Sequence, residues 1–212
     1  MEATRLYSPA VAHLPLDLPG EFADQLRRAL DREGKIARGI DALGSVGDAD
    51  VALIDAEGSD LARRLDEAGA RLVHVPGATP FEADLGDSTV DVLVSPWAAF
   101  RGPDPAEVAE ADRILRPGGR LLVIHDYGRD DVSRLRGDLP EYGVWTRRDG
   151  PFLTGGFRIR VLHCFWTWDD LDEARFFLEG AFGETGAAVA AEMKRPRLSY
   201  NVAIYHRPAG GA

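Results

Sequence analysis

Short apolar segments alternate with amphipathic ones through the middle of the chain, and this alternation limits the fold more than any other feature. Four segments are almost continuously apolar, as expected for strands that are buried on both faces of a parallel sheet. They occupy residues 51–55, 71–75, 90–95 and 120–125. Between them, apolar residues recur at three- and four-residue steps, which predicts helices. The sequence therefore predicts an α/β sandwich whose strand carboxyl ends form the binding edge.

The chain is expected to form one domain over residues 1–212, because a chain of this length normally folds around a single core. Its parts are N-terminal helices in 1–48, the alternating core in 49–137, and C-terminal strands with a helix in 138–212.

The last third is less regular. It predicts strands at 157–168 and 198–206, expected to run antiparallel, and a helix at about 170–182 between them. Aromatic residues gather here and form either core or an interface. If some are exposed, they could join two copies of the chain as a homodimer. They are Phe157, Phe165, Trp166, Trp168, Phe176 and Phe177.

Charge and cysteine content exclude several classes of function. The chain has 35 acidic and 25 basic side chains, a formal charge of −10, which argues against a nucleic-acid partner. Cys164 is the only cysteine, so no intramolecular disulfide can form, and a reducing cytoplasm fits best. Residues 1–16 lack a secretory signal, and no apolar stretch is long enough for a membrane helix, so we expect a soluble cytoplasmic protein. The five histidines are too widely spaced for a helical pair of ligands, and no metal is expected.

Two segments, 91–98 and 109–124, read as strand, loop, helix, Pro-Gly-Gly turn and strand. This pattern resembles the class I S-adenosylmethionine-dependent methyltransferases, in their small-molecule branch. The resemblance implies a Rossmann-like fold with S-adenosylmethionine as cofactor and a small molecule as methyl acceptor. Pro117, Gly118 and Gly119 would supply the turn and touch no reacting atom.

The resemblance also implies a cofactor site at the strand carboxyl ends. Its residues would be Asp55, Gly58, Ser59, Asp84, Ser95, Pro96 and Trp97. His125 and Tyr127 follow the strand at 120–125 and are the best candidates for a catalytic general base. The alternative for His125 is a structural hydrogen bond to a neighbouring loop.

Side chains in two loops depart from the family's pattern. Where the family has a glycine-rich loop, residues 55–61 contain one glycine. Glu57 and Asp60 add carboxylates there, which would either repel a ligand carboxylate or stabilise a helix N-terminus. A ribose-binding acid is expected about 20 residues beyond the glycine turn, and Pro76 stands there instead.

A deletion is the third departure. Only 14 residues separate Val75 from Val90, too few for a helix, a strand and a return helix. The sequence therefore predicts that one strand and helix are deleted after the second strand. The shortened crossing would bring Phe81 beside the position where the adenosine of the cofactor would lie. Because Phe81 and Glu57 would both intrude there, we expect a pocket beside Asp55 and Ser95 that is smaller than a nucleoside site.

Two functions remain open. The first is a divergent methyltransferase that transfers a methyl group from S-adenosylmethionine to a small molecule. The second is a pseudoenzyme, a methyltransferase fold without its cofactor that binds a small molecule or a protein partner, or regulates it.

Overall fold

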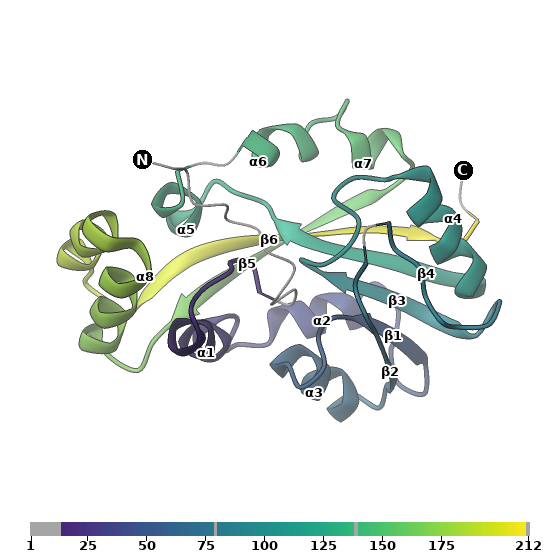
Figure 1. Ribbon diagram of the computed structural model, residues 1–212, viewed down its shortest axis with the longest axis horizontal. Helices are drawn as coiled ribbons and strands as arrows, with labels where there is room; N and C mark the ends of the chain where they lie inside the picture. The colour runs from purple at the N-terminus through teal and green to yellow at the C-terminus, as the bar shows by residue number, and fades with distance from the viewer. Residues whose placement is uncertain (1–13, 79, 138–139, 211–212) are drawn as a thin grey trace.

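The computed structural model describes residues 14–78, 80–137 and 140–210, whose strands form one six-stranded sheet (Figure 1). The strands are β1 (Asp50–Ile54), β2 (Arg71–Val75), β3 (Val90–Pro96), β4 (Leu115–Asp126), β5 (Arg158–Thr167) and β6 (Arg197–Pro208). Their order across the sheet is β2-β1-β3-β4-β6-β5. The first four of these are parallel, and β6 runs antiparallel to both β4 and β5. The predicted mainly parallel sheet with antiparallel C-terminal strands is confirmed.

Helices cover both faces of the sheet. They are α1 (Gly20–Ala29), α2 (Lys35–Asp41), α3 (Asp60–Glu67), α4 (Pro105–Ile114), α5 (Asp131–Leu135), α6 (Pro140–Trp145), α7 (Pro151–Thr154) and α8 (Leu171–Glu192). Buried residues of α1, α2, α3, α5 and α8 share one apolar core, and those of α4, α6 and α7 share the core on the other face. In Figure 1, α1, α2 and α3 lie below the sheet, and α4, α6 and α7 lie above it.

The connection from β2 to β3 confirms the predicted deletion, because its described residues, 76–78 and 80–89, contain no strand or helix. Side chains of α4 hold this crossing in place. Glu107 Oε1 accepts a hydrogen bond from the Phe81 N–H at 3.2 Å, and Glu110 Oε1 accepts one from the Ala83 N–H at 2.9 Å. Arg113 donates to the Leu85 carbonyl at 2.8 Å. The short crossing is therefore fixed by side chains that satisfy its backbone.

The Pro-Gly-Gly segment lies within β4, and not between a helix and the start of a strand as expected. Leu115 already pairs with Val90, and the regular register resumes where Arg120 pairs with Val92. Residues 117–119 thus fall in an irregularity of the β3–β4 ladder, because the strand begins to pair directly after α4 ends.

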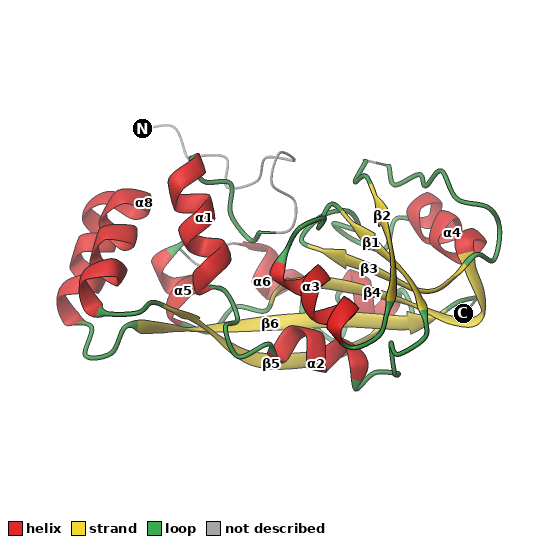
Figure 2. Ribbon diagram, turned by 90° about the horizontal axis from the view of Figure 1, so that it is seen from below, coloured by secondary structure: helices red, strands yellow, loops and turns green. Residues whose placement is uncertain are grey.

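Helix α8 is longer than expected and reverses on itself. The predicted end near Phe182 matches the end of its first half, where Gly183 takes non-helical angles (φ 57°, ψ −135°). The second half then continues to Glu192, and in Figure 2 α8 stands beside α1 and α5 at one end of β5 and β6. At the reversal, a Cβ on Gly186 would lie 1.8 Å from the Leu178 carbonyl oxygen. The two halves can therefore pack this closely only because residue 186 has no side chain.

We expect Gly186→Ala to lower the free energy of unfolding by about 1–3 kcal/mol, because backbone must move to admit the new methyl group. Gly20→Ala is the matched control, since a Cβ there meets no atom within 4 Å. Urea denaturation of both variants measures the difference. Equal stabilities would show that the α8 reversal does not depend on a glycine.

Candidate functional site

The candidate site lies where the chain changes direction across the sheet. From β1 the chain goes to β2 on one side and then returns to β3 on the other side of β1. In open α/β sheets, ligands bind in the crevice at the strand carboxyl ends beside such a point, which is called the topological switch point. A cavity of about 50 Å³ is present here. It is lined by Leu14, Arg27, Leu30, Asp31, Ile36, Ala37, Ser59, Asp60, Leu61, Arg64, Pro96 and Trp97.

The structure brings together three of the sequence-predicted cofactor residues in this cavity, namely Ser59, Pro96 and Trp97. Gly58 lies outside it, on a shallower hollow described below. The others, Asp55, Asp84 and Ser95, line neither space. Of these, Asp84 is exposed on the crossing between β2 and β3.

Asp55 follows β1 and joins the loop after β1 to the loop after β2. Its backbone is left-handed (φ 48°), and its Oδ1 accepts a hydrogen bond from the Gly77 N–H at 2.6 Å. A Cβ on Gly77 would lie 2.0 Å from Asp55 Oδ2, so a side chain at residue 77 cannot be accommodated without moving the carboxylate. One oxygen of the Asp55 carboxylate therefore already has a backbone partner.

Ser95 and Trp97 are both buried, and their polar groups are used inside the protein. The Ser95 hydroxyl donates to the Ala99 carbonyl at 3.1 Å. Trp97 is 4% exposed, and its indole Nε1–H donates to Asp126 Oδ1 at 3.0 Å. Its ring is stacked with Tyr200, with centroids 6.5 Å apart. Trp97 thus closes the cavity as a fixed wall.

Asp126, which sequence reasoning missed, is the centre of a buried polar network at the end of β4. It accepts hydrogen bonds from the Trp97 indole, the Tyr200 hydroxyl and the Arg136 guanidinium. The Asp126 and Arg136 side chains are 1% and 0% exposed. Arg136 also donates to the Pro15 carbonyl at 3.1 Å, which ties the segment before α1 to this network.

The cavity is small, but Asp55 and Ser95, beside which the narrow pocket was expected, do not line it, and the residues that were expected to narrow it do not line it either. Glu57 is exposed and Phe81 packs on the other face of the sheet, with its ring 5.4 Å from that of Phe100. Neither lines the cavity. Leu14, from the segment before α1, and Trp97, from the loop after β3, are both buried and are among the residues that line it. A wider hollow of about 770 Å³ borders the crossing at Pro80, and no residue of the β1 loop lines it.

Asp60 does not carry a free negative charge at the loop after β1. It forms ion pairs with Arg63 and Arg64. Partial burial raises the pKa of Asp60, but the hydrogen bonds from these guanidinium groups outweigh it, so the net pKa shift is downward. Helix α3 is instead capped by Ser59, whose Oγ accepts from the Ala62 N–H at 3.0 Å. The expected repulsion between Asp60 and a ligand carboxylate is therefore largely cancelled.

Arginines surround this helix terminus on the outside. A shallow hollow of about 370 Å³ adjoins Gly58, Ser59 and Asp60. Its basic lining residues are Arg27, Arg28, Arg32, Arg63 and Arg64. Ion pairs join most of them to nearby carboxylates, including Arg27 with Asp24 and Arg32 with Asp169.

His125 points to the opposite face of the sheet from Asp126. It is fully buried, lies 4.7 Å from the Trp145 ring centroid, and Nε2 lies 2.9 Å from the Phe100 carbonyl, to which it donates. Burial lowers the pKa of His125 to about 4, so the ring is neutral at pH 7. Tyr127 is half-buried, and Arg129 lies 5.8 Å above its ring. Neither side chain reaches the cavity at the switch point.

Acid should weaken the fold through His125. Its folded pKa of about 4 lies below the unfolded value of about 6.5, so the unfolded state binds more protons between these pH values, and stability falls as pH falls. Between pH 7.5 and pH 5, the free energy of unfolding of the His125→Gln variant should fall by about 2 kcal/mol less than that of the unaltered protein. Urea denaturation at both pH values tests this. Identical losses would mean that His125 titrates normally in the folded protein.

Removing one partner of the Asp126–Arg136 pair should lower the free energy of unfolding more than removing both charges. Arg136→Met leaves the buried Asp126 carboxylate without the Arg136 countercharge and should cost about 3–5 kcal/mol of stability. Adding Asp126→Asn should restore part of that loss, because the amide oxygen still accepts from Trp97 and Tyr200. Thermal and urea unfolding of the single and double variants give the comparison. Strictly additive costs would exclude coupling between the two charges.

Within the described ranges, 14–78, 80–137 and 140–210, no three His, Cys, Asp or Glu residues lie close enough together to hold a metal ion. No helix in this part of the chain combines the length and apolar character needed to cross a membrane.

Comparisons with known proteins place this architecture. No family model and no curated protein matches the chain. A solved structure from Anabaena variabilis, assigned as a methyltransferase of an antibiotic biosynthesis pathway, superimposes with a TM-score of 0.51 at 12% identity, covering 84% of this chain and 98% of that one. Another, from Anaeromyxobacter dehalogenans and assigned as a type II methyltransferase, gives 0.50 at 17% identity, covering 84% and 97%. The chain therefore has the fold of the class I S-adenosylmethionine-dependent methyltransferases, as its sequence resemblance implies.

Proposed function

We propose that this chain is a non-catalytic protein of methyltransferase fold, which does not bind S-adenosylmethionine at the switch point and acts by binding another molecule. The observation that carries the proposal is the cavity volume of about 50 Å³ beside Ser59, Pro96 and Trp97. Pockets that enclose small-molecule ligands usually measure about 300–1,000 Å³. The cofactor would need space that Leu14 and Trp97 occupy.

The polar groups at the switch point also do not fit the cofactor. Pro76 has no side-chain acceptor for ribose hydroxyls. The Asp55 carboxylate accepts from the Gly77 N–H, and the Ser59 hydroxyl accepts from the Ala62 N–H. A ligand that bound to Asp55 Oδ1, or that donated to Ser59 Oγ in place of Ala62, would have to compete with these internal hydrogen bonds, with little net gain.

The general-base candidates support the same proposal. His125 is buried on the face of the sheet away from the cavity and donates to the Phe100 carbonyl. A general base must come within hydrogen-bond reach of the proton that it removes. His125 cannot meet that condition for a ligand at the switch point without a rearrangement of the Trp145 and Phe152 rings beside it.

Calorimetric titration of the purified protein with S-adenosylmethionine and S-adenosylhomocysteine tests the proposal. We expect no binding tighter than about 1 mM for either ligand, since the cavity does not admit an adenosine. Binding at micromolar concentrations would overturn the proposal in favour of a methyltransferase acting on a small molecule. His125→Gln and Tyr127→Phe would then be the first variants to compare in a methyl-transfer assay.

A repaired variant separates loop chemistry from packing as the cause. Glu57→Gly with Pro76→Asp restores a glycine and an acid at two exposed positions, neither of which lines the cavity. If packing by Leu14 and Trp97 excludes the cofactor, this folded variant should also fail to bind. Binding by the repaired variant alone would show that the loop side chains, and not the packing, exclude it.

A further inference from the structure

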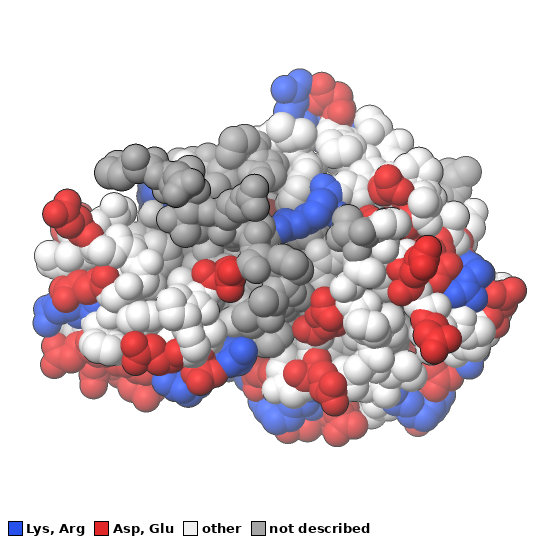
Figure 3. All heavy atoms as spheres, viewed as in Figure 1, with Lys and Arg blue, Asp and Glu red and all other residues white. Residues whose placement is uncertain are grey.

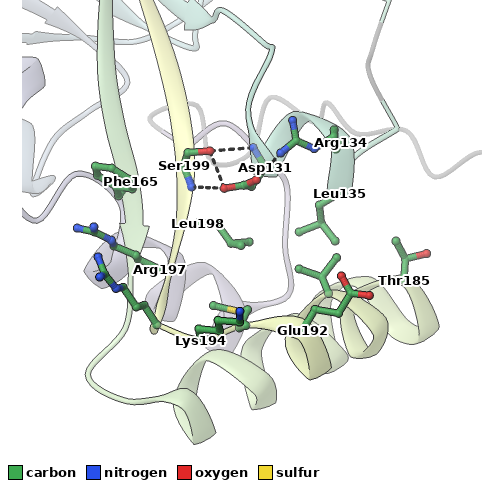
Figure 4. Close-up of a pocket in the computed structure, with 13 residues that line it drawn as sticks. Asp131, Arg134, Leu135, Phe165, Thr185, Glu192, Lys194, Arg197, Leu198 and Ser199 are labelled. Carbon is green, nitrogen blue, oxygen red and sulfur yellow. Dashed lines mark hydrogen bonds and ion pairs between the residues drawn. The ribbon is translucent and has the colours of Figure 1, made fainter.

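A second, larger pocket lies at the far end of the sheet from β2, where β6 begins and β5 ends (Figure 4). Its volume is about 620 Å³, within the range typical of small-molecule sites. Residues of α5, of the second half of α8 and of the start of β6 line this open pocket, and it shares no lining residue with the switch-point cavity. The lining residues are Asp131, Arg134, Leu135, Phe165, Thr185, Val189, Glu192, Met193, Lys194, Arg195, Arg197, Leu198 and Ser199.

The inner part of this pocket is apolar. In Figure 4, Leu198 from β6 and Leu135 from α5 lie in the space between the strand and the helices. Val189 and Met193 of the α8 end, and the half-buried Phe165 of β5, add to this lining. Such a surface favours a ligand with an apolar or aromatic body.

The rim of the pocket is basic in a protein that is otherwise acidic. Four basic side chains line it against two acidic ones, although the whole chain carries a formal charge of −10. On the face shown in Figure 3, acidic side chains are spread over the molecule. The basic residues of the pocket are Arg134, Lys194, Arg195 and Arg197.

Two of these cations are held in position by neighbours. Arg134 pairs with Asp131, whose Oδ2 accepts from both the N–H and the hydroxyl of Ser199 on β6, at 2.9 and 2.6 Å. The guanidinium of Arg197 lies 4.6 Å above the Phe165 ring. Figure 4 shows the Asp131 bonds as dashed lines. The Asp131 charge is therefore already balanced, and Arg197 is stacked at the edge of an aromatic surface.

The other two cations, Lys194 and Arg195, lie in the connection from α8 to β6. Both are exposed, and across the described residues neither takes part in an ion pair. The acidic residues of the lining are Asp131, which pairs with Arg134, and Glu192. The pocket thus has positive charge that the protein itself does not neutralise.

From this arrangement we propose that the pocket binds a small amphipathic anion, with an apolar or aromatic body against Leu198, Leu135 and Phe165 and a carboxylate, sulfonate or phosphate group near Lys194 and Arg195. This inference goes beyond the proposed function. The two sites share no residue, so the two proposals stand or fall separately. Cofactor binding at the switch point would not contradict the anion site, and failure of the anion site would not contradict the proposal that the switch point binds no cofactor.

The fluorescent probe 1-anilinonaphthalene-8-sulfonate has both features, and its titration into the full chain tests the proposal. We expect saturable binding that octanoate displaces more strongly than the uncharged 1-octanol. Lys194→Gln with Arg195→Gln should weaken binding by about threefold to twentyfold, and raised salt should reduce that difference. Glu192→Gln should strengthen it by up to about fivefold. Thr185→Trp, at an exposed lining position, should weaken it by occupying part of the pocket.

The matched control is Arg158→Gln with Arg160→Gln. These exposed arginines carry the same charge change but lie at the other end of β5, at least five residues, or about 16 Å, from Phe165. The control should bind the probe as the unaltered protein does. An equal loss in both double variants, or unchanged binding by Thr185→Trp, would overturn the proposal and mean adventitious binding of the probe elsewhere. Circular dichroism confirms that each variant is folded.

Discussion

The arrangement of the loops at the carboxyl ends of the strands depends on the carboxylate of Asp126. A buried carboxylate is costly unless charges and donors surround it, and here Trp97, Tyr200 and Arg136 do so. These donors come from the loop after β3, from β6 and from the end of α5. Arg136 then reaches Pro15, so the segment before α1 is held over the same edge. One charge therefore fixes four separate parts of the chain around the switch point.

This network also explains why the fold and the expected cofactor site diverge. The strand order that creates the crevice is present, but the cavity there is only about 50 Å³, Trp97 and Leu14 line it, and Asp126 accepts a hydrogen bond from Trp97. A large, partly basic pocket exists instead between α5, α8 and β6. The pocket between α5, α8 and β6 is thus larger than the cavity at the point that the topology suggests, which is why function has to be argued from the sites and not from the fold.

Much of the fold could be predicted from the sequence, because strand periodicity and chain length are local properties. The apolar runs predicted the parallel strands, and the short interval from Val75 to Val90 predicted the missing strand. The site was harder, because it depends on contacts between distant segments. Asp126 stands directly between His125 and Tyr127, yet alternation along β4 sends it to the other face, where its partners lie up to 74 residues away. The contribution of Leu14 had no signal in the sequence pattern at all.

The missing strand also changes the boundary of the sheet. Without it, β2 pairs only with β1 among the described strands, and its other side has no strand partner among them. Such an edge is a template for joining sheets of separate molecules. Here β2 is only five residues long, and Arg71 and His74 are exposed along it, although Val73 is 37% exposed as well. A short strand with a charged side chain at its start discourages that pairing. The edge strand β2, beside which the deleted strand would lie, is therefore protected against aggregation.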